Sequence, residues 1–230
     1  MLPLLREAGY EVTGATRAAS KAEQLRAAGI TPAVVDVYDA AALGAAVAAA
    51  RPDVVIHQLT DLPPGLKPEL MAAGLLRNAR LRIEGTRNLL DAALRAGARR
   101  LIAQSIAFVY APGQEPHDES DPLISPAEEP WRTTMEAVVT LERLTAATPR
   151  LDGIVLRYGY FYGFGTGFDV APGKPAVHVD AAAWAAVLAI ARGAPGIYNV
   201  AEDDGAVSSA RARRELGWNP GFRLSDSAAR

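Results

Sequence analysis

Several polar side chains follow apolar segments at places where they could move a proton. Ser105 and Tyr110 follow one apolar segment, and Tyr158 begins a run of alternating tyrosines. A hydroxyl or a phenol can donate a proton to a reacting group, which makes Ser105, Tyr110 and Tyr158 the candidate catalytic residues. Alternating tyrosines are more often packing residues, and a serine at a strand end is about as often structural. Both interpretations stay open for these residues.

The three histidines give little support to a metal site. His57, His117 and His178 are far apart in the sequence, and no further ligands surround them at metal spacing. The chain has no cysteine and no G-x-S-x-G turn typical of serine hydrolases. His57 ends an apolar segment, where it could act as a general base, although a histidine there is more often a hydrogen-bonded structural residue. We therefore expect no metal.

Charge and hydropathy limit the class of protein. The 230 residues carry a formal net charge of −2, without the basic excess expected of a nucleic-acid-binding protein. No apolar run approaches the roughly 20 residues of a membrane span. Residues 1–5 are followed at once by a charged pair, unlike a signal peptide. We expect a cytoplasmic protein that binds neither nucleic acid nor membrane, which the absence of cysteine fits.

Helices and strands are expected to alternate along the chain. Apolar spacing predicts strands at 11–15, 33–36, 53–57, 101–103, 153–157 and 197–200, with helices at 3–8, 21–28, 40–50, 83–94, 135–145, 181–192 and 209–216. Ser20 with Glu23 forms a capping-box pattern, Asp39 is placed to cap the third helix, and Gly97 stops the fourth. This alternation implies a parallel sheet with helices on both faces. Ligands collect at the carboxyl ends of such strands.

Two segments resemble a known family. Residues 85–110, GTRNLLDAALRAGARRLIAQSIAFVY, resemble the central segment of the extended short-chain dehydrogenases/reductases, the NAD(P)-dependent epimerase/dehydratase family, and RELGWNP at 214–220 resembles its closing motif. The resemblance implies a single α/β domain over 1–230: a Rossmann-like doubly wound parallel sheet (1–152, cofactor part) with a reduced C-terminal substrate-binding part (153–230, mixed). It also implies an oxidoreductase acting on a small carbonyl or hydroxyl compound. Because the superfamily often dimerises through two helices per subunit, a homodimer is implied as well.

Under this resemblance, Arg17 indicates the cofactor. Thr16 stands where NAD-preferring members carry an acid for the adenosine ribose, and Arg17 follows it. A guanidinium can pair with a 2′-phosphate that a carboxylate would repel, so the pair favours NADP over NAD. Arg17 could equally be a solvated loop residue, and Lys21 could assist it or lie exposed on the next helix.

The resemblance assigns further residues to the cofactor. Asp36 and Val37 resemble the acid-plus-apolar pair that touches the adenine, although Asp36 could simply end a buried strand. The segment His57, Gln58 and Leu59 resembles a strand end that passes the cofactor riboses through backbone contacts. The residues that resemble those beside the nicotinamide and substrate are Ser105, Tyr158 and Gly159.

The chain departs from the family at its catalytic positions. The family's Tyr-x-x-x-Lys pair falls on Thr134 and Val138, and its companion hydroxyl falls on Ile106. The glycine-rich G-x-x-G-x-x-G turn that binds the pyrophosphate is absent, so we expect these 230 residues to bind a dinucleotide weakly. Spacing in the C-terminal half is also shorter than expected, as in a truncated chain or one that lacks segments. These departures keep open an alternative, a non-catalytic Rossmann-derived binding or regulatory protein.

Overall fold

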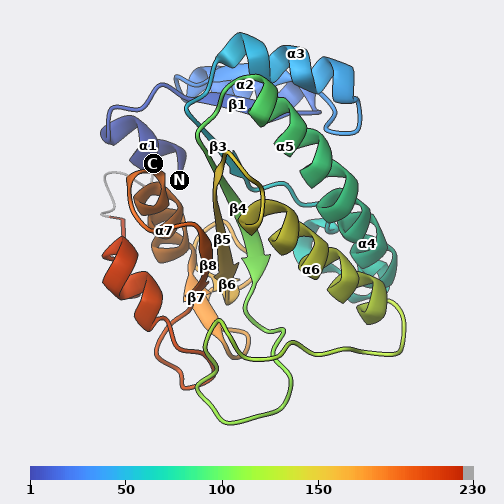
Figure 1. Ribbon diagram of the computed structural model, residues 1–230, viewed down its shortest axis with the longest axis vertical. Coiled ribbons are helices and arrows are strands. Elements are labelled where there is room, and N and C mark those ends of the chain that lie inside the picture. Colours follow the sequence, from blue (N-terminus) through green and yellow to red (C-terminus); the bar gives the residue numbers. More distant parts are fainter. Residues whose placement is uncertain (225–230) are drawn as a thin grey trace.

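The core of the protein is a four-stranded parallel sheet (Figure 1). The structure is a computed structural model that describes residues 1–224. The strands lie side by side in chain order, as β3 (Val54–His57), β4 (Arg100–Ile106), β5 (Asp152–Tyr158) and β8 (Gly196–Val200). All neighbouring pairs are parallel. The four strands therefore end at the same edge, where the candidate site residues follow.

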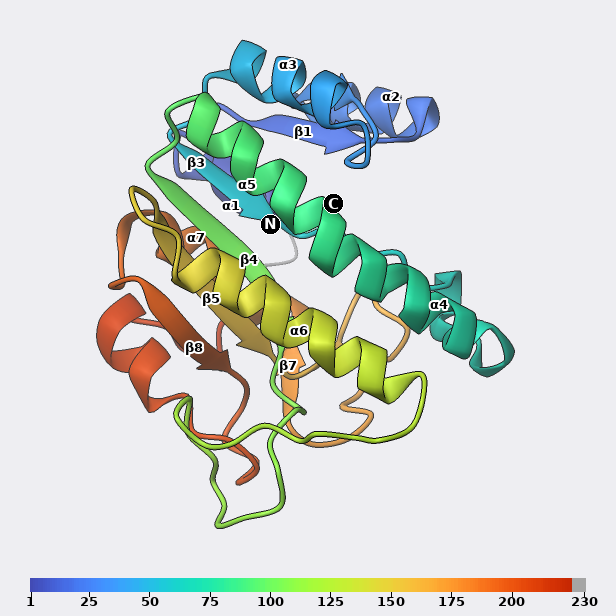
Figure 2. The same ribbon diagram turned by 45° about the vertical axis from the view of Figure 1, so that its right-hand side comes forward.

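Helices cover both faces of this sheet (Figure 2). Helices α5 (Thr86–Arg95) and α6 (Trp131–Ala146) pack on one face, and α7 (Val179–Ala191) packs on the other, with α1 (Leu2–Glu7) beside it. Because both faces are covered, Leu101, Ile102 and Ala103 of β4 are fully buried. The predicted doubly wound α/β arrangement is confirmed.

Two smaller strand pairs complete the fold. β1 (Thr13–Thr16) pairs in parallel with β2 (Thr31–Val34), and β6 (Tyr160–Tyr162) pairs with β7 (Ala176–His178). The first pair carries α2 (Ala19–Ala27) and α3 (Ala40–Ala50), and α3 packs on α5. Within residues 1–224, no ladder joins β1 to β3. The single sheet expected from the sequence is thus divided, and β1 and β3 each keep one edge without a strand partner in this range.

The helix predicted at 83–94 is the second half of a longer helical segment. α4 (Pro68–Arg80) runs without a break into the π-helical residues Leu81–Gly85 and then into α5. Pro68 stands in the first turn, where its missing N–H leaves no hydrogen bond unmade. Gly97, at a φ of +79°, follows the end of α5 as predicted.

The predicted helix caps are partly wrong. Asp39 caps α3 by accepting from the backbone N–H of Ala42. Ser20 lies inside α2 and makes no cap, because that helix begins at Ala19, two residues earlier than predicted. His178 caps α7 through Nδ1, and the carboxylate of Asp180 accepts from the N–H of Leu224.

The C-terminal signature packs against the central sheet. The short helical turns η1 (Pro64–Leu66) and η3 (Ala212–Leu216) complete the secondary structure, and η3 begins later than the helix predicted from 209. Trp218 is buried and its indole N–H donates to the carbonyl of Ala181 at 2.8 Å. Among residues 1–224, no helix is both long and apolar enough to cross a lipid bilayer.

Candidate functional site

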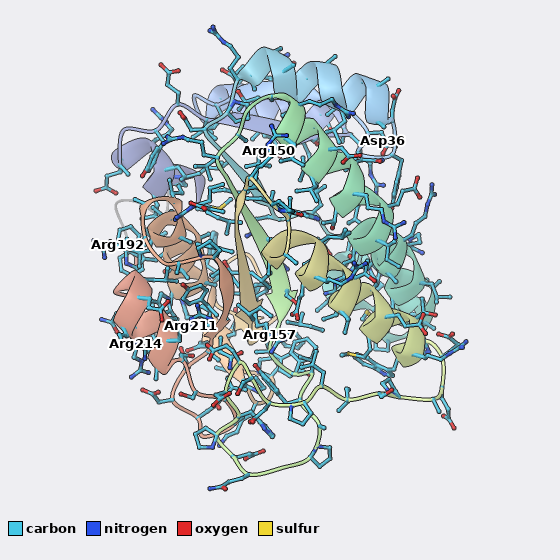
Figure 3. All side chains as sticks on the ribbon, in the orientation of Figure 1. Asp36, Arg150, Arg157, Arg192, Arg211 and Arg214 are labelled. Carbon is cyan, nitrogen blue, oxygen red and sulfur yellow. The ribbon has the colours of Figure 1, made fainter. Side chains whose placement is uncertain are left out.

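Ser105, Arg157 and Tyr158 lie at the carboxyl ends of the adjacent strands β4 and β5. Ser105 of β4 lies in register with Arg157 of β5, and Ile106 lies in register with Tyr158. Figure 3 places Arg157 near these strand ends and Asp36 beside the β1–β2 pair. The predicted site residues therefore form two groups along the sheet edge.

A buried ion pair occupies the first group. Arg157 donates from Nε to Oε1 of Glu142 (2.8 Å) and from Nη2 to Oε2 (2.7 Å), and both side chains are almost fully buried. The Ser105 hydroxyl donates to the same Oε1 at 2.7 Å. Burial works to lower the pKa of Arg157, but the hydrogen bonds and charge of Glu142 raise it above its usual range. Three elements, β4, β5 and α6, are thus tied together by charge-assisted bonds.

Tyr110 belongs to the same network. Its hydroxyl accepts from Nη1 of Arg157 at 2.8 Å and donates to Oδ1 of Asn199 at 2.6 Å. Burial raises the pKa of Tyr110, and the nearby Arg157 only partly opposes this. Its ring stacks on His117, which belongs to the 111–130 loop at this edge of the sheet (Figure 1). The phenol proton is engaged by Asn199, which fixes the ring.

Tyr158 and Gly159 lie on the opposite face of the sheet. Tyr158 is buried with Ile154 beneath α7, and its burial raises the pKa of the phenol strongly. Gly159 lies so close to β7 that an added Cβ would come within 2.7 Å of the carbonyl carbon of Ala176. Packing therefore requires glycine here, whereas the predicted contact of both residues with cofactor or substrate stays a prediction.

The positions to which the family resemblance assigns the Tyr-x-x-x-Lys pair are buried in α6. Thr134 and Val138 are each 1% exposed. The Thr134 hydroxyl donates to the carbonyl of Pro130 at 2.8 Å, a bond within its own helix, and Val138 packs on Val109. With Glu142, these residues follow one another at four-residue spacing on the same side of α6. The phenol and the ammonium of the family's pair are both absent from this side of α6.

His57 is a buried structural histidine. The N–H of Leu59 donates to Nδ1 (3.3 Å), which leaves Nε2 to donate to the Thr86 hydroxyl (3.0 Å). Burial, with a smaller effect from Arg82, lowers the pKa of His57 to about 4. The imidazole is neutral near pH 7 and engaged on both sides, so the hydrogen-bonded interpretation fits better than a general base. The adjacent Gln58 has a buried Nε2 without a hydrogen-bond partner in residues 1–224.

The second group gathers around the ends of β1 and β2. Nη2 of Arg17 donates to Oδ1 of Asp61 at 2.8 Å, and the arginine side chain is mostly exposed. The Thr16 hydroxyl accepts from the backbone N–H of Ala18 and so shapes the turn that presents Arg17. Arg17 is thus paired with Asp61, but its guanidinium stays mostly exposed to solvent.

Asp36 and Val37 form a turn beside Arg17. The carboxylate of Asp36 accepts from the N–H of Tyr38, and the carbonyl of Val37 accepts from the Asn88 side chain. The two segments lie close enough for the negative charge of Asp36 to favour the charged form of Arg17. The geometry fits an adenosine end of a cofactor site, because a polar turn and an exposed cation share one corner.

Sequence reasoning missed the partners that organise the first group. No site role was assigned to Glu142, Asn199 or Arg82 from the sequence. Arg82 lies in the π-helical segment and is only 9% exposed. The one sequence signal for Arg82 was a basic residue at a helical position shortly before Gly85 and Thr86. The structure shows that both of these residues are buried. Residues 1–224 hold no cluster of three or more residues that could bind a metal ion.

Comparison with known proteins decides the family. Residues 1–175 match the model of the NAD dependent epimerase/dehydratase family. The chain belongs to this family. It is 42% identical over 221 residues to a 3-diazoavenalumate denitrifying reductase from Streptomyces sp, covering 87% of this chain and 70% of that protein. The predicted oxidoreductase function is confirmed at the level of the family, and nothing in the comparisons supports the non-catalytic alternative.

Solved structures show the same fold. The UDP-glucose 4-epimerase of Thermotoga maritima, solved with UDP-glucose, has a TM-score of 0.76 at 19% identity and covers 98% of this chain and 90% of its own. The UDP-glucose 4-epimerase of Thermus thermophilus, solved with NAD, has the same TM-score and identity and covers 99% and 92%. These likenesses confirm the Rossmann-type fold, in a family of nicotinamide-cofactor enzymes.

Proposed function

We propose that the protein is an NADP-preferring reductase that replaces the diazo group of a small carboxylate substrate by hydrogen. The observation that carries the proposal is the loss of the phenol and ammonium at Thr134 and Val138 in a chain that is 42% identical to a denitrifying reductase. Like the ligands named for the solved neighbours, the substrate is a small molecule. The family resemblance also supports a cytoplasmic homodimer, which we include in the proposal.

The chemistry of a diazonium group explains why these residues can be absent. Reduction of a carbonyl needs a hydride and a proton, and the proton requires a donor such as the phenol. When a hydride replaces a diazonium group, a C–H bond forms and the C–N bond breaks, and its electron pair leaves with N2. Atoms and charges then balance without any proton from the protein. The residue at 138 can therefore be apolar, and the hydroxyl at 134 can be hydrogen-bonded within its own helix.

The residues present fit the cofactor at its adenosine end and beyond it. Asp36 and Val37 would meet the adenine, Arg17 the 2′-phosphate, and Gln58, whose side chain lies beside the Tyr158 phenol and whose Nε2 is buried, the next part of the molecule. When bound, NADPH supplies the hydride. The protein then has to orient the substrate and exclude water. The hydrogen-bonded network around Glu142 would hold this end of the sheet rigid for that purpose.

Turnover of 3-diazoavenalumate with NADPH and release of N2 test the proposal. Because the 230 residues contain no glycine-rich phosphate turn, the assay compares the chain with an extended chain, which carries the family's strand and glycine-rich turn at its N-terminus. Turnover by the extended chain supports the proposal. Binding of substrate and NADPH without turnover contradicts it.

Replacing Thr134 by valine is expected to leave turnover of the extended chain nearly unchanged. The hydroxyl is bonded within its own helix, so its loss should change kcat by less than about threefold. Initial rates with 3-diazoavenalumate, together with NADPH affinity and a thermal unfolding curve, check this. Abolished turnover with intact folding and cofactor binding would show that Thr134 is catalytic.

Replacing Arg17 by glutamate is expected to reverse the preference for NADP. A charge-assisted contact to the 2′-phosphate should contribute about tenfold or more in affinity, and the glutamate would repel that phosphate. Titration of the extended chain with NADPH and NADH measures the effect. Arg26→Glu, at an exposed arginine that pairs with Glu23, is the matched control. Equal NADPH affinity in wild type and Arg17→Glu would make Arg17 a surface residue only.

A further inference from the structure

The π-helical segment between α4 and α5 carries a buried arginine. Arg82 is 9% exposed, and within residues 1–224 it makes no side-chain hydrogen bond or ion pair. Single π-turns inserted in helices occur frequently at functional sites. The guanidinium has five N–H donors, and its nitrogens are not among the fully buried unpaired side-chain atoms of residues 1–224, so they still reach solvent. The side chain is therefore suited to a partner outside the protein.

The groups around Arg82 leave a positive charge without a counter-charge. Glu142 on α6 is close enough for its charge to act on Arg82, but both carboxylate oxygens of Glu142 are already bonded by Arg157, and one also by Ser105. His57, at the end of β3, is neutral near pH 7. Two buried guanidinium groups thus share one carboxylate. The excess is one positive charge, the condition under which a buried site favours an anion.

Burial keeps this charge in place at neutral pH. It lowers the pKa of Arg82 to about 10, although the charge of Glu142 acts in the opposite direction. A group with this pKa is still protonated near pH 7. Arg82 can therefore offer a full charge and its N–H donors together.

The segment of Arg82 packs against α6, the helix that carries the positions assigned to the family's catalytic pair. The π-helical residues contact α6, and Thr134, Val138 and Glu142 follow one another along it. The guanidinium is close enough to Glu142 and His57 to interact electrostatically with both, so it lies beside the network at the carboxyl ends of the central strands. The proposed substrate is itself an anion, which supplies the charge that this place lacks.

We propose that Arg82 is a substrate-binding residue that holds the carboxylate of the diazo substrate through charge-assisted hydrogen bonds. The inference rests on the proposed function, because it names a specificity determinant of the same site. The guanidinium orients the substrate by its anionic end. It takes no part in proton transfer.

Binding of avenalumate and its methyl ester to the 230-residue chain tests the carboxylate contact. Wild type is expected to bind the acid about 10-fold or more tighter than the ester by calorimetry. Arg82→Gln should bind both with similar affinity, Arg82→Lys should keep part of the difference, and Arg87→Gln, at an exposed arginine of α5, should keep all of it. Equal affinity of wild type for acid and ester, or full discrimination by Arg82→Gln, overturns the proposal.

Thermal unfolding without ligand separates this role from a structural one. If Arg82 carries an uncompensated charge, Arg82→Gln should unfold at the same or a higher temperature than wild type, whereas loss of a structural ion pair with Glu142 would lower it clearly. A clear decrease therefore counts against the proposal.

The kinetics of the extended chain separate the two proposals. Diazo reduction with an unchanged KM in Arg82→Gln contradicts the role of Arg82 and leaves the function standing. Discrimination of acid from ester without diazo reduction contradicts the function and leaves Arg82 as a carboxylate-binding residue.

Discussion

Replacing Glu142 by glutamine is expected to destabilise the fold by about 3–5 kcal/mol, because it leaves buried guanidinium charge without a counter-charge. Arg157 would lose at least one of its two bonds to residue 142, and Arg82 would lose the nearby negative charge. The amide can still accept one bond from Ser105 or Arg157. Urea unfolding followed by circular dichroism measures the free energy of unfolding.

Two further variants separate charge from packing in this experiment. Glu23→Gln removes one member of an exposed ion pair and should change the free energy of unfolding by less than about 1 kcal/mol. The double variant Glu142→Leu with Arg157→Met removes both charges and should recover part of the loss, since apolar side chains of similar volume can replace a buried pair. If Glu142→Gln unfolds within about 1 kcal/mol of wild type, the buried ion pair does not hold the three elements together.

The alternation of helices and strands could be predicted because it depends on local patterns. The apolar run 101–103, the cap at Asp39 and the stop at Gly97 each act through neighbouring residues, and the structure places them as expected. The helix Pro68–Arg80 was missed, and the uninterrupted passage into α5 depends on a π-turn for which the spacing of residues gives no sign.

The candidate site could be predicted only in outline. Parallel strands bring Ser105 and Tyr158 to one edge, which the pattern implies. The partner of Ser105 is 37 residues away on α6, and that partner binds an arginine a further 15 residues on, so no local signal connects them. Arg82 was overlooked because arginine is mostly exposed, and only the packed structure shows that this one is not. The assignment of the catalytic pair to Thr134 and Val138, by contrast, comes from the family resemblance of the sequence and stays a prediction.

The second large effect concerns the hydrogen on the carbon that loses nitrogen. We expect all of this hydrogen to come from the cofactor and none from the protein. If no protein residue supplies a proton to that carbon, the new hydrogen can come only from the cofactor. Reduction of the substrate then needs no proton donor at 134 or 138. This fits the structure, where Thr134 and Val138 are buried and carry neither a phenol nor an ammonium. A reaction that drew this hydrogen from a phenol would instead carry solvent hydrogen into the product.

The measurement is turnover of 3-diazoavenalumate by the extended chain with NADPH deuterated at C4 of the nicotinamide, in ordinary water. The predicted result is one N2 released per NADPH consumed and one deuterium on the carbon that carried the diazo group, when the transferred face is labelled. Labelling the opposite face should give unlabelled product. Product without deuterium from either labelled cofactor, or NADPH oxidation without release of N2, would contradict the account.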